Sequence, residues 1–111
     1  MAYDEDLAAR IHKLVADQAR VTEKRMFGGL AFLVNGNMAV AASGQGGLLV
    51  RVDPAESSQL AETTPATEME MRGRTMAGWL RLTSPDVEAN DELTTWVDRG
   101  VAFAESLPVK R

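Results

Sequence analysis

The chain has 111 residues, of which 45% are hydrophobic and 25% are charged, a composition typical of one globular domain. Twelve basic and sixteen acidic side chains give a formal net charge of −4, which argues against a broad surface for binding nucleic acid. The chain contains no cysteine, which excludes disulfides, thiolate nucleophiles and cysteine-ligated metal sites, and His12 is its single histidine. We therefore expect neither a metal site nor a cofactor.

The N-terminal segment is unlike an export signal, because Asp4, Glu5 and Asp6 stand where a secretory signal carries basic residues. The longest apolar runs, residues 30–34 and 38–42, have five residues each, whereas a membrane-spanning helix needs about 20. We expect a soluble, cytoplasmic protein that does not enter a membrane.

The first predicted element is an amphipathic helix over residues 4–18. Leu7, Ile11 and Leu14 follow helical spacing, and the acidic residues of the first turn favour the positive end of the helix dipole. His12 lies away from the apolar stripe, and we expect it to be solvated.

From Thr22 the apolar period changes to two, which predicts four short strands in succession up to residue 52. Asn35–Gly36 predicts a type I′ turn that joins residues 30–34 and 38–42 in an antiparallel hairpin. Regular alternation would place Met38 and Val40 on the face of Phe32. The opposite face carries small apolar residues, which suggests cover by a helix or a second subunit.

The second half of the chain predicts two helices and two strands. The segment Asp53-Pro54-Ala55-Glu56 predicts the start of a short helix with Asp53 as its N-cap, running to about residue 62. Residues 68–72 and 79–82 read as strands, and residues 90–106 as the last helix. Gly100 in its apolar stripe predicts close packing against the sheet.

The sequence contains no recognisable catalytic constellation. The acidic pairs Glu68 with Glu70 and Asp86 with Glu88 have no partner at the spacing of an acid–base pair or a metal site. The segment 44–47 is rich in glycine but precedes a strand, so it predicts a strand connection rather than a phosphate-binding loop. We predict no catalytic residue and no metal ligand, and an enzyme or ligand binder with a dispersed site stays open as an alternative.

Basic and aromatic side chains interleave in one stretch, made of Arg72, Arg74, Trp79 and Arg81. Arginine and tryptophan are enriched at the energetic centres of protein interfaces, so this stretch is a candidate contact for an acidic protein partner, while Trp79 is more simply read as a core or interface residue. Phosphate contacts with base stacking on Trp79 are the alternative, although nearby carboxylates weaken the positive field.

The segment Arg25-Met26-Phe27-Gly28-Gly29 is followed by a strand, the Asn35–Gly36 turn, a strand from Met38 and then Leu49-Val50-Arg51-Val52-Asp53. Together with the Met76…Gly78-Trp79 segment and the terminal helix containing Trp96, this order resembles the N-terminal domain of the TfoX family, named after a bacterial regulator of natural competence. The residues of the motif themselves predict a structural role, because two apolar side chains point to opposite faces of a strand before a glycine turn.

The resemblance covers nearly the whole chain and implies a single domain over residues 1–111. It implies an α+β fold in two layers, in which an antiparallel sheet of five to six strands carries helices on one side. The predicted order is helix, four strands, helix, two strands, helix. Homodimers are common among such folds, and the family provides no catalytic residues to carry over.

Our leading hypothesis is a non-catalytic regulatory module that acts through protein contacts and forms a homodimer. A regulator of transcription or competence that contacts DNA is the alternative from another class. Steep weakening of binding with salt would distinguish phosphate contacts from protein contacts.

Overall fold

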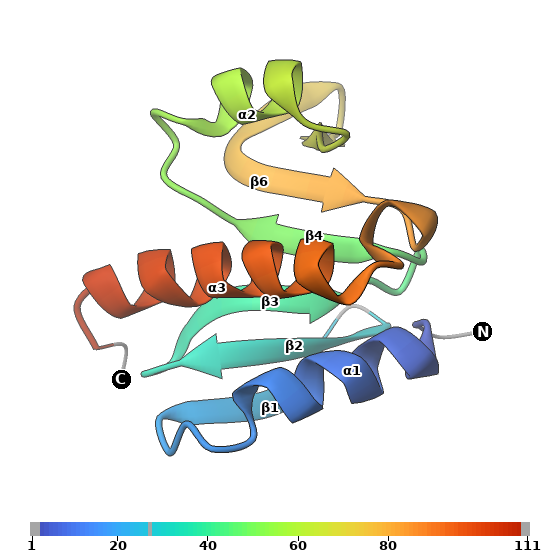
Figure 1. Cartoon of the computed structure of the whole chain (residues 1–111). Helices are drawn as coiled ribbons and strands as arrows, with labels where there is room; N and C mark the ends of the chain where they lie inside the picture. The colour runs from blue at the N-terminus through green and yellow to red at the C-terminus, as the bar shows by residue number, and fades with distance from the viewer. Residues whose placement is uncertain (1–2, 27, 110–111) are drawn as a thin grey trace.

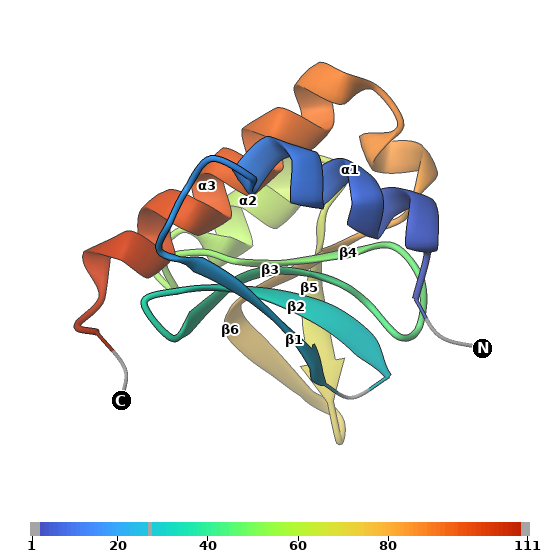
Figure 2. The same ribbon diagram turned by 90° about the horizontal axis from the view of Figure 1, so that it is seen from below.

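The computed structural model describes residues 3–26 and 28–109. The elements in chain order are α1 (Glu5–Val15), β1 (Val21–Met26), β2 (Gly29–Val34), β3 (Asn37–Ala42), β4 (Leu48–Arg51), α2 (Ser57–Thr63), β5 (Thr67–Met71), β6 (Arg74–Leu82), the 3-10 turn η1 (Pro85–Val87) and α3 (Asn90–Ser106). The described strands form a six-stranded antiparallel sheet in the order β1-β2-β3-β4-β6-β5. All three α-helices lie on one side of this sheet (Figure 1 and Figure 2). The predicted α+β class and element order are confirmed.

Helix α1 begins at the residue after Asp4, because the Asp4 carboxylate caps it. Its Oδ1 accepts a hydrogen bond from the Leu7 amide at 3.1 Å, and its Oδ2 accepts one from the Ser84 hydroxyl at 2.8 Å. These hydrogen bonds lower the pKa of Asp4, the Leu7 amide having the larger effect. The helix ends at Val15, earlier than predicted, because the chain turns there to enter β1.

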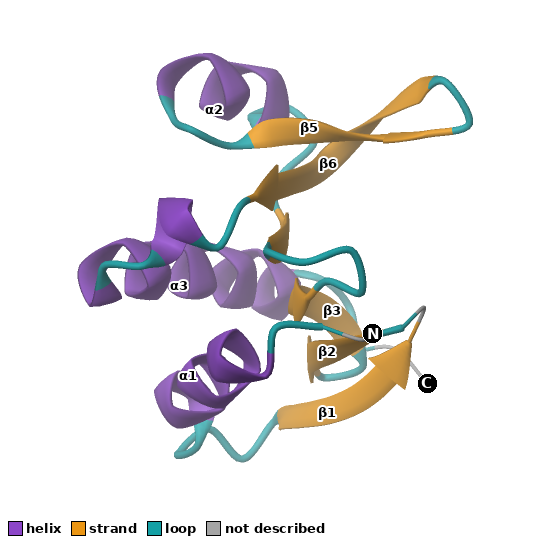
Figure 3. Cartoon of the chain, turned by 90° about the vertical axis from the view of Figure 1, so that its right-hand side faces the viewer, coloured by secondary structure: helices purple, strands orange, loops and turns teal. Residues whose placement is uncertain are grey.

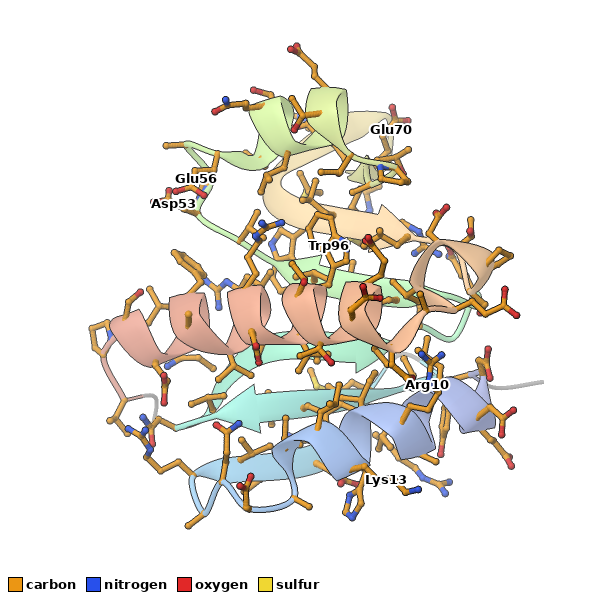
Figure 4. The ribbon with its side chains drawn as sticks, in the orientation of Figure 1. Arg10, Lys13, Asp53, Glu56, Glu70 and Trp96 are labelled. Carbon is orange, nitrogen blue, oxygen red and sulfur yellow. The ribbon has the colours of Figure 1, made fainter. Side chains whose placement is uncertain are left out.

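The main core lies between the helices and the sheet. The sheet contributes Phe32, Val40 and Leu80, each at most 1% exposed. Helix α3 crosses the sheet above β3 and β4, and Figure 4 shows Trp96 on the side of α3 that faces β4. A Cβ atom at Gly100 would lie 2.5 Å from the carbonyl oxygen of Ala39, so the predicted close packing at this glycine is confirmed.

One arginine joins α1 to the turn that precedes α3. The Arg10 guanidinium donates to the carbonyl oxygens of Val87 and Glu88 and to the Asn90 side chain, at 2.9 to 3.0 Å. Figure 4 shows Arg10 pointing from α1 toward the start of α3. This contact holds the two longer helices on the same side of the sheet.

The β2–β3 hairpin has the predicted turn but a different register. Asn35 and Gly36 have φ values of 52° and 85°, positive as a type I′ turn requires. Phe32 pairs with Val40 and Leu33 pairs with Met38, so β3 carries one extra residue at a β-bulge. The bulge turns Met38 away from Val40, and the prediction that these two share a face is wrong.

Helix α2 starts later than predicted. The Asp53 carboxylate accepts a hydrogen bond from the Ala55 amide at 2.9 Å, and the Glu56 amide donates to the Asp53 carbonyl at 2.8 Å. These bonds close a turn over residues 53–56, and the helix begins at Ser57. The prediction of Asp53 as N-cap is therefore wrong, because its capping hydrogen bond stabilises a turn ahead of the helix.

The sheet is strongly curved. The β5–β6 hairpin and β1 both project on the side away from the helices, so the face without helices is concave (Figure 2 and Figure 3). A register irregularity between Glu68 and Glu70 lies in the projecting hairpin. The curvature brings the two ends of the sheet toward each other around a central hollow.

Candidate binding site

The concave face of the sheet contains a hollow of about 350 Å³, which we call the concave groove. All six strands contribute to its lining, and most of the lining is apolar. Its larger apolar side chains, all partly exposed, are Met26, Met38, Leu49, Met69, Met76 and Trp79.

The groove exists because a row of small side chains crosses the middle of the sheet. Cross-strand pairs connect Lys24 to Ala31, Ala31 to Ala41, Ala41 to Leu49 and Leu49 to Arg81. Directly paired residues of antiparallel strands lie on the same face, so this row belongs to the concave face. Ala31 and Ala41 are 1% and 5% exposed and form the floor, where their methyl groups leave the space unfilled. Lys24 on β1 and Arg81 on β6 therefore flank the apolar residues of this row.

The charges of the strands are divided between the two faces of the sheet. Lys24, Arg51 and Arg81 lie on the concave face, since Arg51 pairs with Trp79 in the row next to the floor. Glu23 and Glu68 pair with Phe32 and Leu80, which belong to the core on the helix side. The strand residues that the register places on the concave face are therefore cationic wherever they are charged, although the chain carries a net charge of −4.

Arg81 is partly buried at one end of the groove, and its charge is poorly compensated. Its guanidinium donates to the Ser43 hydroxyl and to the Gly46 carbonyl, both at 3.4 Å, longer than an ordinary N–H···O bond. The ion pairs within residues 3–26 and 28–109 join His12 to Glu23 and Arg20 to Glu105, and neither involves Arg81. Arg81 lines the groove and also a neighbouring hollow that contains Gly46 and Asp86, and most of the donor capacity of its guanidinium is unused.

Arg51 has a different environment. Its guanidinium carbon lies 5.3 Å from the centre of the Trp79 ring and 5.7 Å from the Phe103 ring. These are cation–π distances, so Arg51 is held between a strand and the end of α3. It does not line the groove.

The structure divides the sequence-predicted site residues into two groups. Met26 and Gly29 of the family motif and Trp79 and Arg81 of the basic and aromatic stretch meet in the groove. Arg72 and Arg74 are exposed at the tip of the β5–β6 hairpin and do not line it.

The rest of the family motif lies outside the groove. Arg25 pairs with Leu30 and so lies on the helix side of the sheet. Gly28 is exposed, and Phe27 lies outside the described residues.

Close packing of the backbone requires glycine at position 29. A Cβ atom there would lie 2.4 Å from the Ala42 carbonyl oxygen and 2.9 Å from the Gly44 amide nitrogen. A residue other than glycine would push the 42–44 segment away from β2. The glycine therefore lets this segment approach closely where it forms one wall of the groove.

Several groove residues escaped the sequence analysis. Met38, Leu49 and Met69 were not among the predicted site residues, because methionine and leucine in strands are mainly packing residues. The small side chains at Ala31 and Ala41 were the one available signal of a hollow. That signal required the cross-strand register, which the bulge in β3 hides from a reading of the sequence.

The acidic pairs do not form a site. The Glu68 carboxylate accepts a hydrogen bond from the Ser57 hydroxyl at 3.4 Å on the helix side, and Glu70 lies beyond the register irregularity. Within the described part of the chain, no group of three or more histidine or acidic side chains is placed to hold a metal ion.

Comparison with known proteins identifies the chain. The family model of the TfoX N-terminal domain matches residues 13–104. The chain belongs to the TfoX N-terminal domain family. The match includes every strand that lines the groove, and the family is of a regulatory rather than an enzymatic type. No curated protein matches this sequence. None of the helices in the described ranges is long and apolar enough to cross a bilayer.

Proposed function

We propose that this TfoX N-terminal domain is a cytoplasmic, non-catalytic regulatory module, a single domain over residues 1–111, that acts through protein contacts at its concave face. The observation that supports the proposal is the concave groove, where Met38, Leu49, Trp79 and other apolar side chains stay uncovered. A contiguous apolar surface of this kind marks an interaction site in many proteins, and methionine side chains adapt to differently shaped partners.

The test is affinity capture from native extract with two matched charge insertions. Met38→Glu places a carboxylate in the groove, whereas Ala102→Glu places one on the exposed surface of α3. We expect the proteins captured by the wild type to be lost with Met38→Glu and retained with Ala102→Glu. Identical capture by both variants, or no specific capture by the wild type, would contradict the proposal.

A homodimer is part of the same proposal. Strands β1 and β5 are the edges of the sheet, and their outer backbone groups are available to pair with a second copy. Joining two grooves face to face would instead bring Lys24 and Arg81 of both copies together, which charge repulsion disfavours. Sedimentation equilibrium should show a dimer at micromolar concentration, and a monomer throughout that range would remove this part of the proposal.

Contact with DNA is the second candidate, supported by Arg72 and Arg74 at an exposed projecting hairpin tip (Figure 3). Phosphate contacts weaken steeply as salt rises, so electrophoretic shifts measured across salt concentrations provide the test. If this candidate is correct, the double variant Arg72→Ala, Arg74→Ala should reduce both the affinity and the salt dependence. Absence of binding at low salt would eliminate it.

A further inference from the structure

We infer that the concave groove binds a small apolar monocarboxylate, with its aliphatic part against the methionine side chains and its carboxylate on Arg81. This inference goes beyond the proposed regulatory function. It rests on the shape and charge of the groove alone, so ligand binding can be tested whether or not a protein partner exists.

The size and lining of the groove suit an aliphatic ligand. Its volume of about 350 Å³ is within the range of small-molecule sites, roughly 300 to 1,000 Å³. Ala31 and Ala41 provide a flat apolar floor, and Met26, Met38 and Met76 stand around it. Flexible thioether side chains can close around a chain that has no fixed shape.

Among the described residues that line the groove, Arg81 is the one cation, and it defines the head group. A guanidinium presents parallel N–H donors that match the two oxygens of a carboxylate. Arg81 makes only two long hydrogen bonds, at 3.4 Å, to Ser43 and Gly46, so a carboxylate can bind it without breaking a strong contact.

Neighbouring charges favour the same ligand. Lys24 shares the concave face with Arg81, whereas the Arg51 guanidinium lies against Phe103 of α3 and outside the groove. The carboxylates of Glu23 and Glu68 are on the other side of the sheet. The local field therefore attracts an anion into an apolar hollow. A neutral apolar ligand would leave the Arg81 charge uncompensated, and a cation would be repelled.

The two tryptophans make binding visible by fluorescence. Trp79 lines the groove and is partly exposed, whereas Trp96 is 2% exposed in the core on the opposite side of the sheet. A ligand in the groove should change the emission of Trp79 and leave that of Trp96 unaltered. Trp79→Phe should abolish the signal, and calorimetry on that variant should still detect the ligand.

The experiment compares three probes in the wild-type protein at neutral pH: decanoate, 1-decanol and acetate. We expect saturable binding of decanoate, weaker binding of decanol because it lacks the charge, and no measurable binding of acetate because it lacks the chain. Equal affinity for decanoate and decanol would overturn the assignment of Arg81 to the head group. Absence of a decanoate response into the millimolar range would overturn the site itself.

Matched arginine variants test the head group directly. Arg81→Gln should weaken decanoate binding about tenfold, as expected for a charged hydrogen bond, and leave decanol binding unchanged. Arg99→Gln is the control, because Arg99 stacks on Trp96 at 4.7 Å on the helix side. Equal affinity of Arg81→Gln and wild type for decanoate would contradict the inference.

A second variant keeps the test decisive if Arg81→Gln does not fold. Met76→Glu adds a carboxylate to the groove wall and should repel decanoate more than decanol. Unchanged decanoate binding in this variant would also contradict the inference. Affinity capture with the wild type, Met38→Glu and Ala102→Glu reports the protein contacts separately, and sedimentation reports the homodimer, so failure of ligand binding and failure of the proposed function give different results.

Discussion

The two faces of the sheet differ in how their apolar side chains are covered. On the helix side, Phe32, Val40 and Leu80 are covered by the three α-helices and form a closed core. On the concave side, alanines at the floor and methionines around them leave a hollow. Both faces are apolar in sequence. Apolar strand residues therefore become core where a helix covers them, and they become a binding surface where the sheet curves away from the helices.

Adjacent leucines on β4 provide the largest expected contrast. Leu48 is 1% exposed in the core, whereas Leu49 is partly exposed in the groove. Leu48→Ala should lower the free energy of unfolding by about 2–5 kcal/mol, because it leaves a cavity in packed surroundings. Leu49→Ala should cost about 1 kcal/mol or less, because it removes less buried area. Urea unfolding of both variants measures the difference, and equal losses would show that the groove belongs to the core.

The contact between α3 and β3 is the next test of the covered face. Gly100→Ala should lower the free energy of unfolding by about 1–3 kcal/mol, because the added Cβ would meet the Ala39 carbonyl at 2.5 Å. This loss would appear although alanine favours a helix by about 1 kcal/mol over glycine.

Ala102→Gly, at an exposed position of the same helix, is its control and should lose only that propensity, about 1 kcal/mol. Thermal unfolding of both variants provides the measurement. Stabilisation by Gly100→Ala would contradict the close approach of α3 to the sheet.

The smallest expected effect concerns the cap that places α1 on the covered face. Asp4→Ala should lower the free energy of unfolding by about 1 kcal/mol near neutral pH, because the Leu7 amide and the Ser84 hydroxyl lose their acceptor. Asp17→Ala, at an exposed position after the helix, is the matched control and should have little effect.

The loss of stability caused by Asp4→Ala should depend on pH. The folded-state pKa of Asp4 is lowered, so its contribution is fully present above the ordinary aspartate pKa of about 3.9 and is lost as pH falls through the lower folded value. The difference between wild type and Asp4→Ala should therefore shrink below about pH 4. A difference that stays constant down to pH 2 would show that the carboxylate charge does not contribute.

The parts of the fold that depend on local signals were predictable. The period of the apolar residues indicated α1, α3 and the strands, and Asn35–Gly36 indicated its turn, because helix and strand periods and positive φ are properties of neighbouring residues. The start of α2 was not predicted correctly, because an aspartate followed by proline suits both a helix cap and a turn.

Fewer features of the candidate site than of the fold could be predicted from the sequence. Trp79 and Arg81 were identified by residue type, but Arg72 and Arg74 of the same stretch lie at the hairpin tip. The register irregularity between Glu68 and Glu70 and the curvature of the β5–β6 hairpin separate them. Met38 was assigned to the wrong face because of one extra residue in β3.

Local sequence patterns were enough to predict the kind and order of the elements, the family and the apolar character of both sheet faces. The three-dimensional packing was needed to show which face the helices cover, and that Ala31 and Ala41, in the row between Lys24 and Arg81, form the floor of a groove. The physical reason is the separation in sequence of the residues that interact. Backbone conformation and periodicity arise between residues a few positions apart, whereas the register, the curvature and the side on which α1 and α3 dock depend on contacts between segments distant in the chain.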